Sequence, residues 1–154
     1  MSLPNRMLPE EEAQRILAEG RWGVLSTASA AGEPYAVPIN YVWMPEERCL
    51  LFHCATEGKK LQNLGENPRF SLAVVGAERL VPERYTTHYE SALAEGHAQL
   101  VEEEAERRAL LTRLAEHFSP GNPRQSEVVE AFLPRTALVK LHVERLTAKR
   151  NRDE

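Results

Sequence analysis

The chain has 154 residues, of which 42% are hydrophobic and 27% are charged, and its formal net charge is −4. This length and composition suffice for one globular domain with a buried core, so we expect a single domain over residues 1–154. Acidic and basic residues are interspersed, and no apolar run approaches the ~20 residues that a membrane-spanning helix needs, so neither a nucleic-acid partner nor a membrane partner is expected.

The start of the chain lacks the basic-then-apolar pattern of a signal peptide, and Pro9 with three following glutamates opens a helix there instead. The two cysteines, Cys49 and Cys54, lie on one predicted strand with opposite parity, so no disulfide is expected between them. These features predict a cytoplasmic protein.

The first third of the chain predicts one helix followed by three strands. Residues 9–19 have apolar positions at helical spacing and are followed by Gly20, a common helix stop. The segments 21–28, 35–43 and 49–54 have the composition of strands and are joined by short turns. Strands joined in this way pair antiparallel, so we expect a β-meander and not parallel units with helical crossovers.

The middle of the chain predicts a second helix and two further strands. The helix is expected over residues 57–66, with Thr56 as its cap, and the next strand over residues 69–77. A less regular stretch, residues 78–88, then precedes a long strand at residues 89–101.

The last third predicts two helices and a final strand. The clearest helical pattern covers residues 102–118, a shorter helix is expected at about residues 124–132, and a strand at about residues 136–144. The charged tail from Ala148 is expected to be frayed. About six antiparallel strands in this order tend to curl into a small barrel with helices over its openings. The residues themselves therefore predict an α+β, mainly β fold built on an antiparallel barrel or sheet.

The stretch from the third strand into the second helix carries the first candidate site. Alternation along the strand directs Phe52 and Cys54, with their apolar neighbours on the same face, to the core, and it leaves His53 on the opposite face. Lys59 and Lys60 fall in the first helical turn, where free N–H groups and the helix dipole already attract anions. Two cations at this end indicate a bound anion, usually phosphate, or else a solvated lysine pair.

The second strand has a similar division of its two faces. Its odd positions are bulky and apolar, whereas its even face carries Ala36, Pro38 and Asn40. Proline removes a hydrogen-bond donor from a sheet, so Pro38 indicates a sheet edge, a bulge, or a place where a ligand lies against the backbone.

Other site chemistries fit the sequence poorly. Cys49 and His53 share a strand face but lie ~13 Å apart at the rise of a strand, and no zinc-type spacing occurs, so no metal site is expected. Cys54 is expected to point inward, where a thiol is inert as a nucleophile. The chain has no P-loop and no Gly-x-Gly-x-x-Gly motif, so a bound phosphate would belong to a small cofactor of another kind.

The motif Phe-His-Cys-Ala-Thr-Glu-Gly-Lys-Lys at residues 52–60, followed by Leu-x-x-Leu-x-x-Asn-Pro at residues 61–68, resembles the strand–turn–helix of the pyridoxamine 5'-phosphate oxidase-like split-barrel flavoproteins. The chain most resembles their nitroimidazole-resistance (Nim) branch, and the likeness includes residues 32–41 and Tyr-Glu-Ser at residues 89–91. It implies an antiparallel split β-barrel of about six strands with flanking helices, which binds FMN as a homodimer with flavin sites at the interface.

The resemblance also implies which residues form the flavin site: Pro38, Ile39, Asn40, His53, Ala55, Thr56, Lys59, Lys60, Tyr89 and Ser91. The lysine pair and Thr56 would hold the phosphate, and the strand around Pro38 would border the isoalloxazine ring. Tyr89 and Ser91 would serve a site completed by the other subunit.

His53 is the candidate catalytic residue. Between flavin and substrate, an imidazole could donate a proton or a hydrogen bond; the alternative is a neutral structural histidine. The resemblance implies an FMN-dependent oxidoreductase that reduces a small, nitro-aromatic or other, substrate. A flavin or haem carrier or sensor, with His53 as axial ligand, is the rival interpretation. Oxidation of pyridoxamine 5'-phosphate is not favoured, because the final strand lacks a recognisable basic motif of that enzyme.

Overall fold

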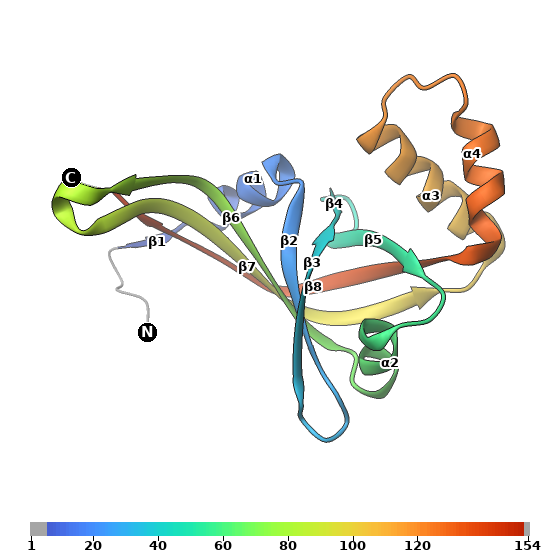
Figure 1. The fold of residues 1–154 in the computed structure, drawn as a ribbon, viewed down its shortest axis with the longest axis horizontal. Coiled ribbons are helices and arrows are strands. Elements are labelled where there is room, and N and C mark those ends of the chain that lie inside the picture. The colour runs from blue at the N-terminus through green and yellow to red at the C-terminus, as the bar shows by residue number, and fades with distance from the viewer. Residues whose placement is uncertain (1–5, 153–154) are drawn as a thin grey trace.

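The structure is a computed structural model that describes residues 6–152 (Figure 1). Its helices and strands follow one another in this order: β1 (Met7–Leu8), α1 (Glu10–Glu19), β2 (Trp22–Ala28), β3 (Pro34–Asn40), β4 (Val42–Met44), β5 (Cys49–Ala55), α2 (Lys59–Glu66), β6 (Arg69–Val81), η2 (Pro82–Arg84), β7 (Thr86–Val101), α3 (Glu104–Phe118), α4 (Gln125–Phe132), η3 (Leu133–Arg135) and β8 (Thr136–Asn151).

All strands belong to one antiparallel sheet in the order β3-β2-β6-β7-β8-β5-β4, with the short β1 paired to β8. The predicted mainly β, antiparallel fold with flanking helices is therefore confirmed. The two edge strands, β3 and β4, are separated along the chain by Tyr41 alone. Because one short segment supplies both edges, the sheet has to curl until its edges approach each other. It stays open there, as in a split barrel, since β3 and β4 do not pair.

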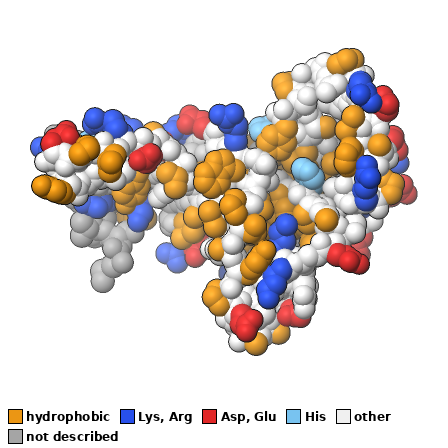
Figure 2. Space-filling model, in the orientation of Figure 1, with side chains coloured by type: hydrophobic (Ala, Val, Ile, Leu, Met, Phe, Trp, Pro, Cys, Tyr) orange, Lys and Arg blue, Asp and Glu red, His pale blue; other side chains and the backbone are white. Residues whose placement is uncertain are grey.

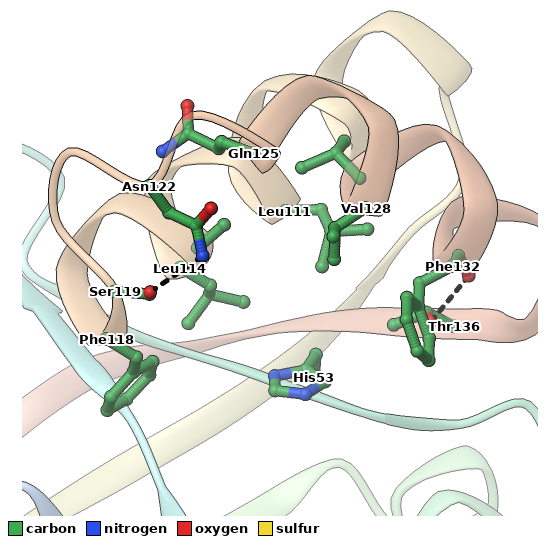
Figure 3. Close-up of a pocket in the computed structure, with 12 residues that line it drawn as sticks. His53, Leu111, Leu114, Phe118, Ser119, Asn122, Gln125, Val128, Phe132 and Thr136 are labelled. Carbon is green, nitrogen blue, oxygen red and sulfur yellow. Dashed lines mark hydrogen bonds between the residues drawn. The ribbon is translucent and has the colours of Figure 1, made fainter.

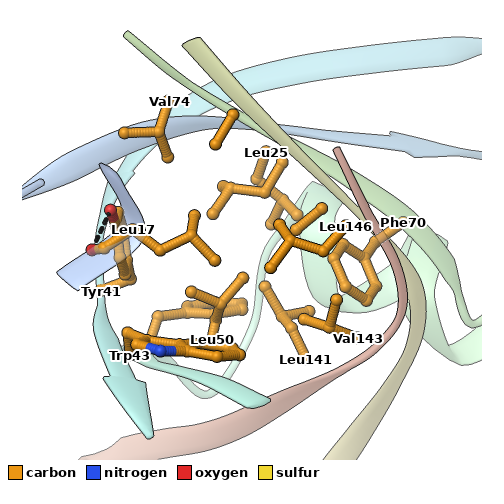
Figure 4. Packing of buried hydrophobic residues seen from close by; sticks show 14 of the residues in the cluster. Leu17, Leu25, Tyr41, Trp43, Leu50, Phe70, Val74, Leu141, Val143 and Leu146 are labelled. Atoms are coloured by element: carbon orange, nitrogen blue, oxygen red, sulfur yellow. Dashed lines mark hydrogen bonds between the residues drawn. The ribbon is translucent and has the colours of Figure 1, made fainter. Parts of the chain in front are cut away.

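The inside of this curl holds the main hydrophobic core (Figure 4). Helix α1 covers one opening and buries Ala13, Ile16 and Leu17. The buried hydroxyl of Tyr41 donates a hydrogen bond to the Leu17 carbonyl at 2.7 Å, which holds the helix against the junction of β3 and β4. Each large side chain buried here contributes about 1.5–3 kcal/mol relative to an exposed one.

A second cluster of buried side chains lies on the outer face of β5, beneath α3 and α4. Here Cys49 and Leu51 of β5 pack with leucines of α3 and with Val129 of α4. The sequence assigned only the Phe52 face of this strand to the core. In the structure both faces are buried over the first half of β5, because the two helices cover the outer one.

Three local predictions were wrong. The stretch 78–88 is not irregular, because β6 and β7 extend through most of it as a long hairpin closed by η2. The tail from Ala148 is not frayed: this residue is 3% exposed and pairs with both β1 and β7. Thr56 does not cap α2, because the helix begins at Lys59 after Gly58 and has no side-chain cap.

None of the helices within residues 6–152 combines the length and the apolar character needed to cross a membrane. The hairpin of β6 and β7 instead projects from the barrel as an arm, opposite to the end covered by α3 and α4 (Figure 1).

Candidate functional site

The junction of β5 and α2 carries two lysines that are not neutralised. Lys59 and Lys60 lie in the first turn of α2, as predicted, and that turn contains no acidic residue. Within residues 6–152 neither ammonium group forms an ion pair. Burial raises the pKa of the nearby Cys54 thiol, and the charge of Lys60 partly opposes this increase. The helix terminus therefore combines free N–H groups with two available cations, an arrangement that suits an anion.

The exposed face of β3 lies on an edge of the sheet. Pro38 and Asn40 are both exposed, and the Asn40 side chain donates to the Arg21 carbonyl at 3.0 Å. Ile39, by contrast, turns its side chain into the core, so only its backbone faces this surface. The edge position alone explains why the sheet tolerates a proline here, and contact with a ligand would be an additional role of the same face.

A buried hydrogen bond holds α2 against β2. Asn63 of α2 is 1% exposed and donates to the Thr27 hydroxyl of β2 at 3.1 Å. Thr27 pairs with Tyr35 of β3, which lies three residues, or ~10 Å, from Pro38 along the strand. Thr27 and Tyr35 lie on the inner face of their strands, together with the core residue Ile39, whereas Pro38 and Asn40 point from the opposite face. The hydrogen bond therefore packs α2 against the inner face of β2, and the exposed face of β3 looks away from it. Sequence reasoning missed Asn63; its only signal was a polar residue beside the apolar stripe of the helix.

His53 projects from the outer face of β5 beneath α3 and α4 (Figure 3). Its imidazole makes no hydrogen bond or ion pair with any residue in the described part of the chain. His53 is exposed to solvent, but partial desolvation beneath the helices lowers its pKa below the ordinary value, so the neutral imidazole predominates at neutral pH. The residue thus combines a reactive group with an absence of structural hydrogen bonds.

Two neighbouring hollows meet at His53. One, of about 290 Å³, lies between the imidazole and helices α3 and α4; Figure 2 shows hydrophobic side chains gathered on this face between the helices and the strands below them. The other, of about 470 Å³, lies over Cys54 and Ala55 and reaches Arg135 of η3. His53 and Phe132 line both. Two predicted site residues, His53 and Ala55, therefore border one open hollow.

Arg135 is a further candidate residue that sequence reasoning missed. Its guanidinium carbon lies 4.5 Å from the centre of the Phe132 ring, at the side of the second hollow. In the sequence it follows Pro134 in a connecting segment and gives no signal. Only the pairing of Thr136, the residue after η3, with Ala55 of β5 places this cation near His53.

Tyr89 and Ser91 do not meet the other predicted residues within one chain. On the shared neighbour β8, His53 pairs with Leu138 and Tyr89 with Asn151. These positions are 151 − 138 = 13 residues apart, which corresponds to ~43 Å along a strand. A role for Tyr89 and Ser91 in the same site therefore requires a second copy of the chain, and it stays a prediction.

Comparison with known proteins gives a family and a fold. The family model described as pyridoxamine 5'-phosphate oxidase matches residues 9–150. A comparison with curated protein sequences finds no significant match.

Solved structures with the same fold include three that cover nearly all of this chain. A candidate 5-nitroimidazole antibiotic resistance protein from Bacteroides thetaiotaomicron has a TM-score of 0.78 at 21% identity, over 93% of this chain and 85% of its own. An FAD-binding protein from Mesorhizobium loti has a TM-score of 0.71 at 20% identity, over 96% and 98%. An FAD and haem binding protein from Mycobacterium smegmatis has a TM-score of 0.78 at 19% identity, over 94% and 72%. At these identities the likeness establishes the fold alone.

Proposed function

Because the chain belongs to the pyridoxamine 5'-phosphate oxidase family, we propose that it is an FMN-binding protein that reduces a small substrate with electrons from the bound flavin. Proteins of the same fold include an FAD-binding protein and one that binds both FAD and haem, which supports a flavin or a haem as the ligand. The observation that carries the choice of FMN is the pair of lysines in the first turn of α2, neither of which forms an ion pair with any described residue.

The lysine turn fits a phosphorylated flavin. Lys59 and Lys60, with the N–H groups of the first helical turn, would hold the phosphate by charge-assisted hydrogen bonds. Thr56 is exposed in the turn before them and would add a hydroxyl. Along β3, Pro38 and Asn40 would border the ring system, and the backbone of Ile39 would face its polar edge.

FMN, when bound, would supply the redox chemistry. The residues of this protein would bind and orient the reactants and would transfer or hold a proton. His53 suits the second task, because its neutral imidazole can donate one hydrogen bond, accept another, and carry a proton once it is charged. The nearby thiol of Cys54 has no such role, since burial raises its pKa.

The test of the phosphate site is the double variant Lys59→Glu/Lys60→Glu. Reversing both charges should weaken FMN binding by about 2–4 kcal/mol, because attraction becomes repulsion at a charge-assisted site. Riboflavin has the same ring without the phosphate and should lose far less affinity. Flavin fluorescence titrations of both ligands, with wild-type protein beside the variant, measure the difference. Equal losses for the two ligands would show that the lysines do not hold the phosphate.

Haem is the second candidate ligand. The observation in its favour is the imidazole of His53, which lies beside an apolar hollow and has no partner among residues 6–152. Such a histidine could serve as an axial ligand. The absorption spectrum of the purified protein separates the two proposals: paired flavin bands support FMN, and a Soret band that disappears in His53→Ala supports haem.

A further inference from the structure

The hollow between His53 and helices α3 and α4, here called the helix pocket, is distinct from the lysine turn and the face of β3. Its volume is about 290 Å³, at the lower end of the range for small-molecule sites. The side chains of Leu111, Leu114, Phe118 and Val128 form most of its walls, and Figure 3 shows His53 at its base between Phe118 and Phe132. The pocket is therefore ring-sized, apolar, and open to an imidazole at one side.

The polar side chains around the helix pocket are already engaged, with one exception. Asn122 donates to Ser119 at 3.2 Å, and Gln125 donates to a glutamate of α3 at 2.6 Å. Thr136 donates to a backbone carbonyl of α4 at 2.7 Å. Among the described residues that line the pocket, His53 alone has a polar side chain without a protein partner. Because His53 is exposed at the side of this apolar hollow and no described residue occupies its ring nitrogens, a ligand in the pocket can hydrogen-bond to it in place of water.

The lining also determines what charge an occupant can carry. Among the described residues it contains no aspartate, glutamate, lysine or arginine. An anion or cation would lose its hydration there without gaining an opposite charge, which is costly in an apolar site. Arg135 does not alter this, because it lies over Phe132 and lines the neighbouring hollow.

We propose that the helix pocket binds an uncharged, aromatic small molecule, whose ring packs between α3 and α4 and whose one polar group forms a hydrogen bond with His53. The proposal that such a molecule binds rests only on the shape and lining of the helix pocket. That the bound molecule is the substrate of the flavin rests on the proposed function, since His53 and Phe132 form the border between this pocket and the hollow over Ala55. A phosphorylated ring, such as a pyridoxine phosphate, does not match this lining.

The test compares two ligands that differ by one charged group. 2-Naphthol is a neutral bicycle with a single hydroxyl, and 6-hydroxynaphthalene-2-sulfonate is the same bicycle with an added anion. Fluorescence titration of the protein as purified should give a dissociation constant of about 10–100 µM for 2-naphthol, a value in keeping with its few atoms. The sulfonate should bind at least about tenfold more weakly. Equal affinities of the two ligands would overturn the proposal.

Two variants on α4 locate the bound molecule. Val128 lines the pocket, so Val128→Arg places a cation in it and should weaken 2-naphthol binding by about tenfold or more. Ser126 is exposed, lies on the same helix and does not line the pocket, so Ser126→Arg adds the same charge and should leave the affinity unchanged. Equal affinity in the two variants would place the ligand elsewhere and refute the proposal.

His53 has its own readout, which does not depend on any variant folding. In wild-type protein, 2-naphthol should shift the imidazole NMR signals of His53 and leave those of His97 and His142 in place, because these two stack on each other away from the pocket. His53→Leu should weaken binding by roughly three- to tenfold, the loss of one neutral hydrogen bond. An unmoved His53 signal at saturating 2-naphthol would contradict the proposal. FMN binding without 2-naphthol binding would refute the pocket alone, and the reverse result would refute the flavin function alone.

Discussion

At the scale of single residues, His53 links the two hollows and is the residue whose replacement is most informative. It has no partner among the described residues, so His53→Ala should leave the stability of the protein nearly unchanged. If the imidazole transfers a proton or positions the substrate, the variant should keep FMN and lose roughly 10²-fold in turnover. The measurement is flavin content beside the rate of substrate reduction by photoreduced protein. A flavin-replete variant that works at the wild-type rate would return His53 to a structural role.

The pH dependence of that reaction follows from the direction of the pKa shift. Partial desolvation lowers the pKa of His53, so the limb that reports its protonation should lie below the ordinary value of 6.5. Because the charged form is disfavoured in the folded protein, protonation of His53 at acid pH also removes stability and does not add it. His53→Ala should abolish the limb, whereas a limb that persists in the variant belongs to another group.

At the scale of secondary structure, Gly96 decides how β7 passes β8. The pairing of these strands shifts register between Glu95 and Gly96, and a methyl group at Gly96 would collide with the backbone carbonyl of His142. Glycine is required at this position because the two backbones approach too closely for any side chain. This irregularity lies within the barrel, because the core residues Ala94 and Val143 lie on either side of it.

Two glycine substitutions test this account. Gly96→Ala should destabilise the protein by at least about 1–3 kcal/mol, because the rigid backbone of β8 has to move. Gly65→Ala is the matched control: this glycine lies in α2 with open space around it, so alanine should stabilise the helix by about 0.5–1 kcal/mol. Urea unfolding of both variants measures the two free energies. Destabilisation of similar size in both would mean that crowding at Gly96 is not the cause.

At the scale of the whole molecule, the projecting arm has features that favour a second subunit. It exposes large hydrophobic side chains, among them Val75, Leu80 and Tyr85, which are 61%, 63% and 98% exposed. It also carries Tyr89 and Ser91, which lie far from the lysine turn of their own chain. A two-fold dimer would cover the arm and could bring these residues to the site of the partner.

We therefore expect a homodimer whose flavin sites lie at the interface. Light scattering at micromolar concentration should give twice the mass of 17.4 kDa for one chain. Leu80→Glu, on the exposed part of the arm, should shift the equilibrium toward monomer and weaken FMN binding together with it. Ser126→Glu, on α4 and away from the arm, is the control for added charge. Tight flavin binding by a monomeric wild-type protein would contradict the expectation.

Much of the fold follows from local sequence, because the spacing of apolar residues and the glycine and proline residues that end helices and strands depend only on near neighbours along the chain. Alternation in residues 35–43 correctly separated the core side of Ile39 from the exposed side of Pro38 and Asn40. Helix periodicity gave α1 and α3 to within a few residues, and Gly20 ended α1 as expected. The lysine pair fell in the first turn of α2 for the same reason: turn signals and apolar spacing are local properties.

What the sequence did not determine depends on contacts between segments far apart along the chain. Ala148 belongs to a strand and not to a tail, because β1 and β7 supply partners for its backbone. Cys49 and Leu51 are buried, because α3 and α4 fold back over β5 from more than fifty residues away. The same helices form the apolar pocket over His53. The alternation of residues along the strand predicted that His53 points away from the core. Only the tertiary structure determined what it faces, because the surroundings of a surface residue depend on which distant elements cover that surface.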